Sequence, residues 1–204
     1  GGSKISTKID LLSNLVKKVD FLVIGGAMAN TFLLEQGLNI GNSLAETDKI
    51  DVVKNVLQRA KENDCSIILP KEVVVSKNLD DIEGTKNIDI NKMNNDLVIF
   101  DVGDKTIEEI CNTASTCKTI FWNGPLGVYE KPPYDNSTNV IGRTIAILTK
   151  SNMVTSVVGG GDTVAALNNA ELTGGFSYVS IAGGALVEWL EGKKLPGLLF
   201  LENL

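Results

Sequence analysis

The sequence predicts an α/β domain built on an open, mostly parallel sheet with helices on both faces. Three observations support this fold class. Short, continuous apolar runs alternate with longer segments of helical periodicity, which is typical of strands that are buried on both faces and joined by helices. Four of the runs end in glycine, where a strand can turn sharply into a helix. The chain has 204 residues, 43% of them hydrophobic, which suits one domain with a substantial core.

The strands are identified by short apolar runs that a glycine, a proline or a polar segment ends. The run Asp20–Ile24 stops at Gly25, for example, and Ser66–Leu69 stops at Pro70. In chain order the strands are expected at residues 20–24, 66–69, 72–76, 97–100, 119–122, 153–158 and 178–181.

The helices are identified by apolar residues at helical spacing, as with Val53, Val56 and Ala60. They are expected at residues 27–35, 47–61, 106–114, 138–149, 162–169 and 185–190, with a further helix that begins near Ser6. The segment 77–95 is polar and irregular. No repeat or linker divides the sequence, so we expect one Rossmann-like, three-layer domain over residues 1–204 with right-handed crossovers.

Composition excludes several classes of function. The net charge of −6 argues against nucleic acid as a partner, and no apolar run reaches the roughly 20 residues that span a bilayer. The chain has no histidine, which excludes a Ser-His-Asp triad and histidine-bearing zinc sites. The first ten residues lack the apolar core of a secretion signal. Three cysteines at spacings that fit no zinc pattern indicate free thiols, and we expect a cytoplasmic protein.

Glycines gather at the predicted carboxyl ends of the strands, at Gly25–Gly26, Gly124, Gly159–Gly161 and Gly183–Gly184. Gly2 would close a further strand that this chain does not contain. In parallel sheets ligands bind at this edge, and the helix that follows each turn favours anions. A single pair could serve only a tight turn, but the group as a whole indicates a phosphate-bearing ligand.

The stretch VVGGGDTVAAL, residues 157–167, leaves two interpretations open. It lacks the lysine of a Walker A loop, and Val164 breaks the dinucleotide fingerprint G-x-G-x-x-G. Asp162 or Thr163 could simply cap a helix. Alternatively, Asp162 holds Mg²⁺ while Thr163 and the amides of 160–163 hold phosphates.

Two further stretches also admit two interpretations each. Lys4 and Lys8, four residues apart near a helix start, are either solvated or flank a bound anion. In FWNGPLGVYE, residues 121–130, Asn123 offers both a donor and an acceptor, and Glu130 could accept hydrogen bonds from ribose hydroxyls. The alternative for this stretch is a structural turn beside Trp122.

Five motifs occur in order along the chain: GGSKISTK, VIGGAMANTF, WNGPLGVYE, VVGGGDT and LEGKKLPG. Together they make the chain resemble, nearly end to end, the C-terminal, nucleotide-binding domain of phosphoglycerate kinase. The resemblance implies a two-domain kinase that moves a phosphoryl group between 1,3-bisphosphoglycerate and ADP. The N-terminal, triose-binding domain would be absent from this chain. Because GGSK looks like the middle of a motif, we expect residues 1–204 to be a piece of a longer protein.

The resemblance also implies roles for individual residues. Lys4 would neutralise the phosphoryl group in transfer, and Gly183 and Gly184 would face that group. Lys8, Gly160, Gly161 and Thr163 would bind nucleotide phosphates, and Asp162 would hold Mg²⁺. The remaining nucleotide contacts would come from Asn123 and Pro125 beside the phosphates and ribose, Glu130 on the ribose, and Gly2, Ser3, Gly25, Gly26, Leu44 and Val128 around the adenine.

The chain departs from the family pattern at a few positions. Ala27 stands where the family has a third glycine, Asp104 replaces a proline, and Ile181 replaces a hydroxyl near the phosphoryl path. We expect a monomer that binds MgADP or MgATP and is inactive without the triose-binding domain. The alternative, favoured by Ile181 and Ala182, is a non-catalytic nucleotide-binding or interaction module of the same fold.

Overall fold

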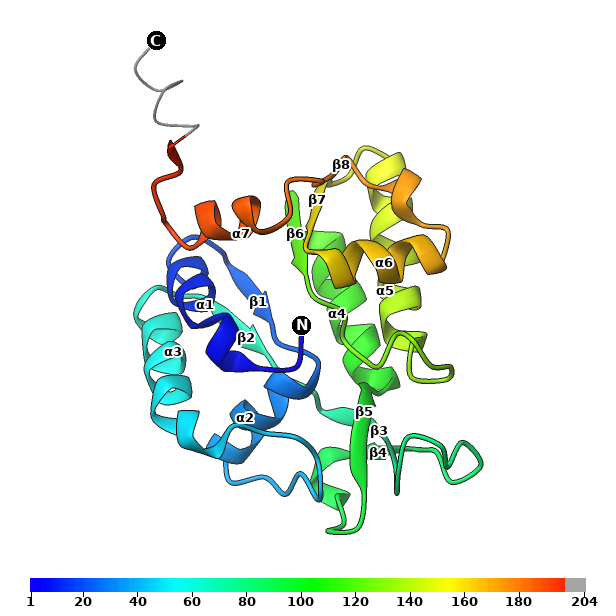
Figure 1. The fold of residues 1–204 in the computed structure, drawn as a ribbon. Coiled ribbons are helices and arrows are strands. Elements are labelled where there is room, and N and C mark those ends of the chain that lie inside the picture. The colour runs from blue at the N-terminus through cyan, green and yellow to red at the C-terminus, as the bar shows by residue number, and fades with distance from the viewer. Residues whose placement is uncertain (197–204) are drawn as a thin grey trace.

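The computed structural model describes residues 1–196 and has the predicted α/β class, with parallel strands flanked by helices (Figure 1). The strands are β1 (Phe21–Val23), β2 (Ser66–Ile68), β3 (Glu72–Ser76), β4 (Lys86–Asp89), β5 (Val98–Val102), β6 (Thr119–Asn123), β7 (Thr155–Gly159) and β8 (Tyr178–Val179). The α-helices are α1 (Ile9–Leu15), α2 (Ala27–Glu35), α3 (Ile50–Glu62), α4 (Asp104–Thr116), α5 (Asn136–Lys150), α6 (Gly161–Asn169) and α7 (Gly184–Leu190). Short 3₁₀ turns are η1 (Ile5–Thr7), η2 (Thr47–Lys49), η3 (Ile90–Lys92) and η4 (Thr173–Gly175).

Hydrogen bonds divide the strands of residues 1–196 into three groups rather than one continuous sheet. The pair β1–β2 and the group β6–β7–β8 are parallel, as predicted. The group β4–β3–β5 is antiparallel, with β3 in the middle running opposite to both of its neighbours. An apolar cavity of about 540 Å³, lined in part by Leu15 and Ile120, separates β1 from β6.

Two local expectations differ from the structure. The segment 77–95 contains β4 and η3, which the sequence did not indicate because β4 reads KNID and its residues are exposed or half-buried. Such a strand shows no alternation of apolar and polar residues. The helix expected near Ser6 begins as η1, and α1 starts only at Ile9.

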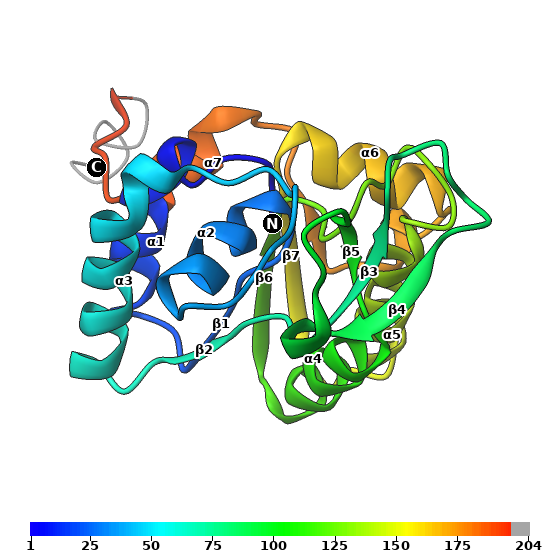
Figure 2. The same ribbon diagram turned by 90° about the horizontal axis from the view of Figure 1, so that it is seen from below.

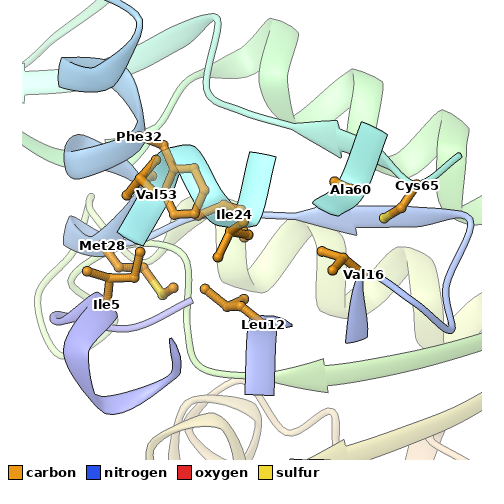
Figure 3. Close-up of a cluster of buried hydrophobic side chains, with 11 residues drawn as sticks. Ile5, Leu12, Val16, Ile24, Met28, Phe32, Val53, Ala60 and Cys65 are labelled. Atoms are coloured by element: carbon orange, nitrogen blue, oxygen red, sulfur yellow. The ribbon is translucent and has the colours of Figure 1, made fainter. Parts of the chain in front are cut away.

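The buried hydrophobic side chains of residues 1–196 form four clusters, of which two are the largest. Figure 3 shows the first, where Phe32 and Val53 pack with side chains of α1, α2, α3 and β1, and both are fully buried. Burial of one such side chain is worth roughly 1.5–3 kcal/mol. The second core, around Trp122, Val158 and Leu167, joins α4, α5 and α6 to β6 and β7. Figure 2 shows the two helix groups on either side, with β6 and β7 between them.

Strand register brings the carboxyl ends of β6, β7 and β8 to one edge. Asn123 lies opposite Gly159, and Val158 lies opposite Val179. Helices α6 and α7 begin just beyond this edge, with Gly160 and Gly183 as their N-cap residues. The predicted convergence of glycine turns is confirmed for these strands. No helix within residues 1–196 is long and apolar enough to cross a membrane.

Candidate functional site

A pocket of about 380 Å³ opens at this edge, between the start of α1, the first turn of α6 and α7. The predicted residues that line it are Lys8, Asn123, Gly160, Gly161, Asp162, Thr163 and Gly184. Gly124, one of the predicted strand-end glycines, also lines it, as do residues that were not assigned a role from the sequence: Thr7, Val187, Glu188, Glu191 and Lys193. The last two form an ion pair of 2.8 Å with each other.

Lys8 is hydrogen-bonded to Asn123 on β6 and, through Asn123, is connected to β7. Its Nζ donates to Asn123 Oδ1 at 2.5 Å and to the carbonyl oxygen of Gly1 at 2.6 Å. Asn123 Nδ2 in turn donates to the carbonyl oxygen of Gly159 at 2.8 Å. A lysine can only donate and a carbonyl can only accept, so these contacts fix the orientation of the Asn123 amide.

The Lys8 ammonium is bonded to neutral acceptors, and its surroundings disfavour its charge. Burial lowers the pKa of Lys8 to about 8, and the Asp162 carboxylate opposes this only in part. A desolvated cation without a close carboxylate is stabilised by an anion placed beside it. The predicted phosphate contact of Lys8 therefore suits its position.

The first turn of α6 presents free backbone donors. The first helical hydrogen bond runs from Val164 N to Gly160 O at 3.0 Å. The amides of Gly161, Asp162 and Thr163 precede this bond and have no partner inside the helix. They lie on the pocket wall with the positive end of the helix dipole.

The Thr163 side chain has a structural role. Its Oγ1 donates to Gly159 O at 3.0 Å and accepts from Gly124 N at 2.6 Å, and the residue is fully buried. This hydroxyl locks the β6 turn onto α6. The contact with phosphate that the resemblance implies for Thr163 is therefore left to its amide.

Asp162 is exposed in the first turn of α6, and no side chain caps this helix. Its carboxylate makes no hydrogen bond or ion pair within residues 1–196. No group of three or more acidic, cysteine or histidine side chains in that range could hold a metal ion. One free carboxylate beside phosphate-binding amides fits Mg²⁺, which is commonly held by one or two carboxylates together with substrate phosphates.

The turns expected around the adenine interlock through their backbones. Met28 N donates to Gly2 O at 3.0 Å, and Gly26 N donates to Leu126 O at 2.9 Å. A Cβ at Gly26, whose φ is +68°, would lie 2.5 Å from Gly2 O. A Cβ at Gly25 would lie 2.1 Å from the Leu126 side chain. Position 26 therefore requires glycine, whereas a side chain at Gly25 would displace that of Leu126.

The remaining predicted residues lie outside the pocket lining. Pro125 is buried. It lies against the first residue of the chain, because a Cβ at Gly1 would be 1.9 Å from the Pro125 carbonyl oxygen. Val128 is half-buried, and its N–H donates to Phe100 O at 3.0 Å. The exposed residues are Ser3, Lys4, Leu44 and Glu130.

Tyr129 responds to carboxylates from both the 124–130 turn and the start of α6. Desolvation raises the pKa of its phenol, and the carboxylates of Glu130 and Asp162 raise it further. Both carboxylates therefore lie within electrostatic range of one side chain.

Helix α7 is held more loosely than α6. All of its residues are at least partly exposed, and Ile181 before it is 95% exposed. Asn14 Nδ2 donates to Leu190 O at 2.5 Å and so ties α7 to α1. Gly183 has a φ of +56°, while Gly184 lines the pocket. Gly197, the last residue of the LEGKKLPG motif, lies outside the described residues.

The family model for phosphoglycerate kinase matches residues 1–193. The chain belongs to the phosphoglycerate kinase family. The phosphoglycerate kinase of Rhizobium meliloti is 50% identical over 198 residues, covering 97% of this chain and 50% of the relative. That of Rhizorhabdus wittichii is 48% identical over 202 residues, covering 99% of this chain and 51% of the relative. The chain thus spans about half the length of the curated phosphoglycerate kinases that it matches.

Solved structures agree with this assignment. The structure of phosphoglycerate kinase from Coxiella burnetii aligns with a TM-score of 0.94 at 42% identity, over 100% of this chain and 51% of that one. The phosphoglycerate kinase of Pyrococcus horikoshii shares the fold, with a TM-score of 0.79 at 24% identity. The predicted family and fold class are confirmed.

Proposed function

We propose that residues 1–204 form the nucleotide-binding, C-terminal domain of a two-domain phosphoglycerate kinase. The whole enzyme would transfer a phosphoryl group between 1,3-bisphosphoglycerate and ADP, giving 3-phosphoglycerate and ATP in glycolysis. One observation carries the proposal. The Lys8 ammonium and the free amides of 161–163 converge on one pocket beside the Asp162 carboxylate.

The phosphates of ADP or ATP bind at this pocket. Lys8 supplies a positive charge, and Gly160, Gly161 and Thr163 supply backbone donors at the start of α6. Asn123 holds Lys8 in place and contacts the phosphate end together with Pro125. Asp162 would hold Mg²⁺, which would reduce the negative charge of the nucleotide phosphates.

The base and ribose lie towards the interlocked turns. Gly26 lets its backbone approach that of Gly2, and Gly25 leaves room for the Leu126 side chain, so we place the adenine against these turns. Further contacts with the base and ribose come from Ser3, Leu44, Val128 and Glu130.

The transfer step relies on positioning and charge neutralisation rather than covalent chemistry. Lys4 neutralises the moving phosphoryl group, and the amides at Gly183 and Gly184 face it. A general base is not needed, because the attacking group is already an anion: a phosphate of ADP in one direction and a carboxylate in the other.

The triose substrate would bind to the other domain of the whole enzyme. We therefore propose that the 204-residue chain alone is a cytoplasmic monomer that binds MgADP or MgATP without turning over. Neither nucleic acid nor a membrane would be a partner, in keeping with the net charge of −6.

Calorimetric titration of the chain with MgADP tests the binding half of the proposal. We expect measurable binding, and an affinity loss of about tenfold or more in Lys8→Met, since a charged contact to phosphate is lost. Lys17→Met, which removes an exposed lysine just after α1, is the matched control and should bind like the wild type. Absence of MgADP binding to the folded wild-type chain would overturn the proposal.

Steady-state assay tests the catalytic half. The chain alone should show no turnover, and adding the N-terminal half of a full-length relative should restore it. The second candidate is a non-catalytic nucleotide-binding or interaction module, favoured by the exposed apolar side chain of Ile181 beside the pocket edge. Nucleotide binding without activity in the completed two-domain enzyme would favour that candidate.

A further inference from the structure

A buried carboxylate outside the pocket holds the turn that carries the proposed ribose and base contacts. Asp101, on β5, is only 2% exposed. Its Oδ2 accepts from Ser137 N at 2.9 Å, and its Oδ1 accepts from Val102 N at 2.8 Å and from the Ser137 hydroxyl. Burial raises the pKa of Asp101 to about 7, and the hydrogen bonds from Ser137 oppose this shift.

The turn formed by residues 126–130 rests directly on this carboxylate. A Cβ at Gly127 would lie 2.3 Å from Asp101 Oδ1, so the turn backbone touches the carboxylate. The next residue, Val128, donates its N–H to Phe100 O at 3.0 Å, which fixes it to the same strand. Leu126 N donates to Thr138 Oγ1 at 3.1 Å, so the turn is also fixed to the start of α5.

Asp101 therefore joins the three parts that set the path of the turn: β5, the backbone at Gly127 and the first turn of α5. Val128 and Glu130 lie one and three residues beyond Gly127, and both depend on that path. The phosphate pocket is lined mainly by the start of α6, by α7, Asn123 and Lys8, and Gly124, which also lines it, is held by the Thr163 hydroxyl rather than by Asp101. A change at Asp101 should reach one end of the nucleotide site and leave the other intact.

We propose that Asp101 is a positioning residue for the base and ribose end of the nucleotide site, acting through the 126–130 turn. This inference rests on the proposed function, since it assigns nucleotide contacts to Val128 and Glu130. It adds a residue with no ligand contact of its own to that site.

Asn is a sharp probe because it keeps the shape of the side chain. Both carboxylate oxygens accept from a backbone N–H. Whichever way an amide at this position turns, its NH₂ group faces one of those N–H donors, so one buried hydrogen bond is lost. Either loss weakens the hold of Asp101 on the turn and on the start of α5.

The experiment compares two ligands on Asp101→Asn. We expect the dissociation constant of MgADP to rise about tenfold, as for a lost hydrogen bond to a charged group. That of magnesium tripolyphosphate, which has no base or ribose, should stay within about twofold. Hydrogen exchange of the Val128 amide should accelerate in the ligand-free chain, while that of Thr163 should not.

Ser156→Ala is the matched control, because Ser156 is also buried and its Oγ also accepts a backbone N–H, from Ser177 at 3.1 Å. It lies near the opposite end of its strand, so it should lower stability without changing the ratio of the two affinities. Ser137→Ala, which removes only the hydroxyl donor to Asp101, replaces Asp101→Asn if that variant does not fold.

The outcomes separate the two proposals. A wild type that binds no MgADP overturns the proposed function together with the role of Asp101. A wild type that binds, with Asp101→Asn unchanged for MgADP or weakened equally for both ligands, overturns only the positioning role.

Discussion

Helices α6 and α7 both begin with a glycine turn at the same edge of the strands, yet they are held in opposite ways. A Cβ at Gly160 would lie 2.5 Å from Asn123 Nδ2, and the Thr163 hydroxyl bonds to two neighbouring turns. Around Gly183 and Gly184, a Cβ would find open space within residues 1–196. The first helix presents donors already fixed in place, whereas the start of the second has open space around it.

Among substitutions that test this difference between α6 and α7, the one at Gly160 is expected to have the largest effect on stability and MgADP binding. Its φ of +97° is strained for any other residue, and a Cβ would displace Asn123, which holds Lys8. Gly160→Ala should lower the free energy of unfolding by about 3 kcal/mol and weaken MgADP binding. Denaturant unfolding and calorimetry measure the two effects. Gly161→Ala is the control for the unfolding measurement, because its Cβ would meet open space in the same turn; equal losses of stability in both variants would contradict the account.

Thr163→Val tests the lock between α6 and the β6 turn. The substitution leaves Gly124 N without its acceptor in a buried position, which costs about 1–3 kcal/mol. Denaturant unfolding should show this loss. Thr155→Val, on the exposed start of β7, should change stability by no more than about 0.5 kcal/mol. A Thr163→Val chain as stable as that control would show that the lock contributes little.

Proton uptake on MgADP binding tests whether Lys8 contacts the phosphates. The pKa of Lys8 is lowered from 10.5 in the unfolded chain to about 8 in the folded chain. Its contribution to stability is therefore present above pH 10.5 and is lost as the pH falls through about 8. A bound phosphate would raise this pKa, so MgADP binding near pH 8 should take up part of a proton. Calorimetry in buffers of different ionisation enthalpy measures the uptake. It should vanish in Lys8→Met, and an equal uptake there would contradict the assignment.

The smallest effect is expected at α7. Gly184 has an ordinary φ and room for a methyl group, so Gly184→Ala should change stability by no more than about 0.5 kcal/mol. MgADP affinity of the chain alone should be unchanged in the same titration. A loss as large as that at Gly160 would show that α7 is as constrained as α6.

The convergence of the glycine turns, though not the contrast between α6 and α7, could be predicted from the sequence because it rests on local signals. Apolar strands that end in glycine predicted that Asn123, Gly160 and Gly183 would meet at one edge, and the distinctive motifs predicted the family. The antiparallel group was hidden because β4 has no apolar alternation.

The parts that the sequence did not predict depend on contacts between distant segments. The Thr163 hydroxyl bonds to Gly124, 39 residues away, and Asp101 to Ser137, 36 residues away. Neither partner is marked by spacing or residue type. Lys8 was predicted as a phosphate ligand, but its attachment to Asn123 emerges only when α1 and β6 are placed together.

Amide chemical shifts of the ¹⁵N-labelled 21.8 kDa chain during MgADP titration test the central claim most directly. The account predicts that the amides of Gly161, Asp162 and Thr163 move most, with smaller shifts at Gly183 and Gly184. Saturable shifts confined to other segments, with 161–163 unmoved, would contradict it.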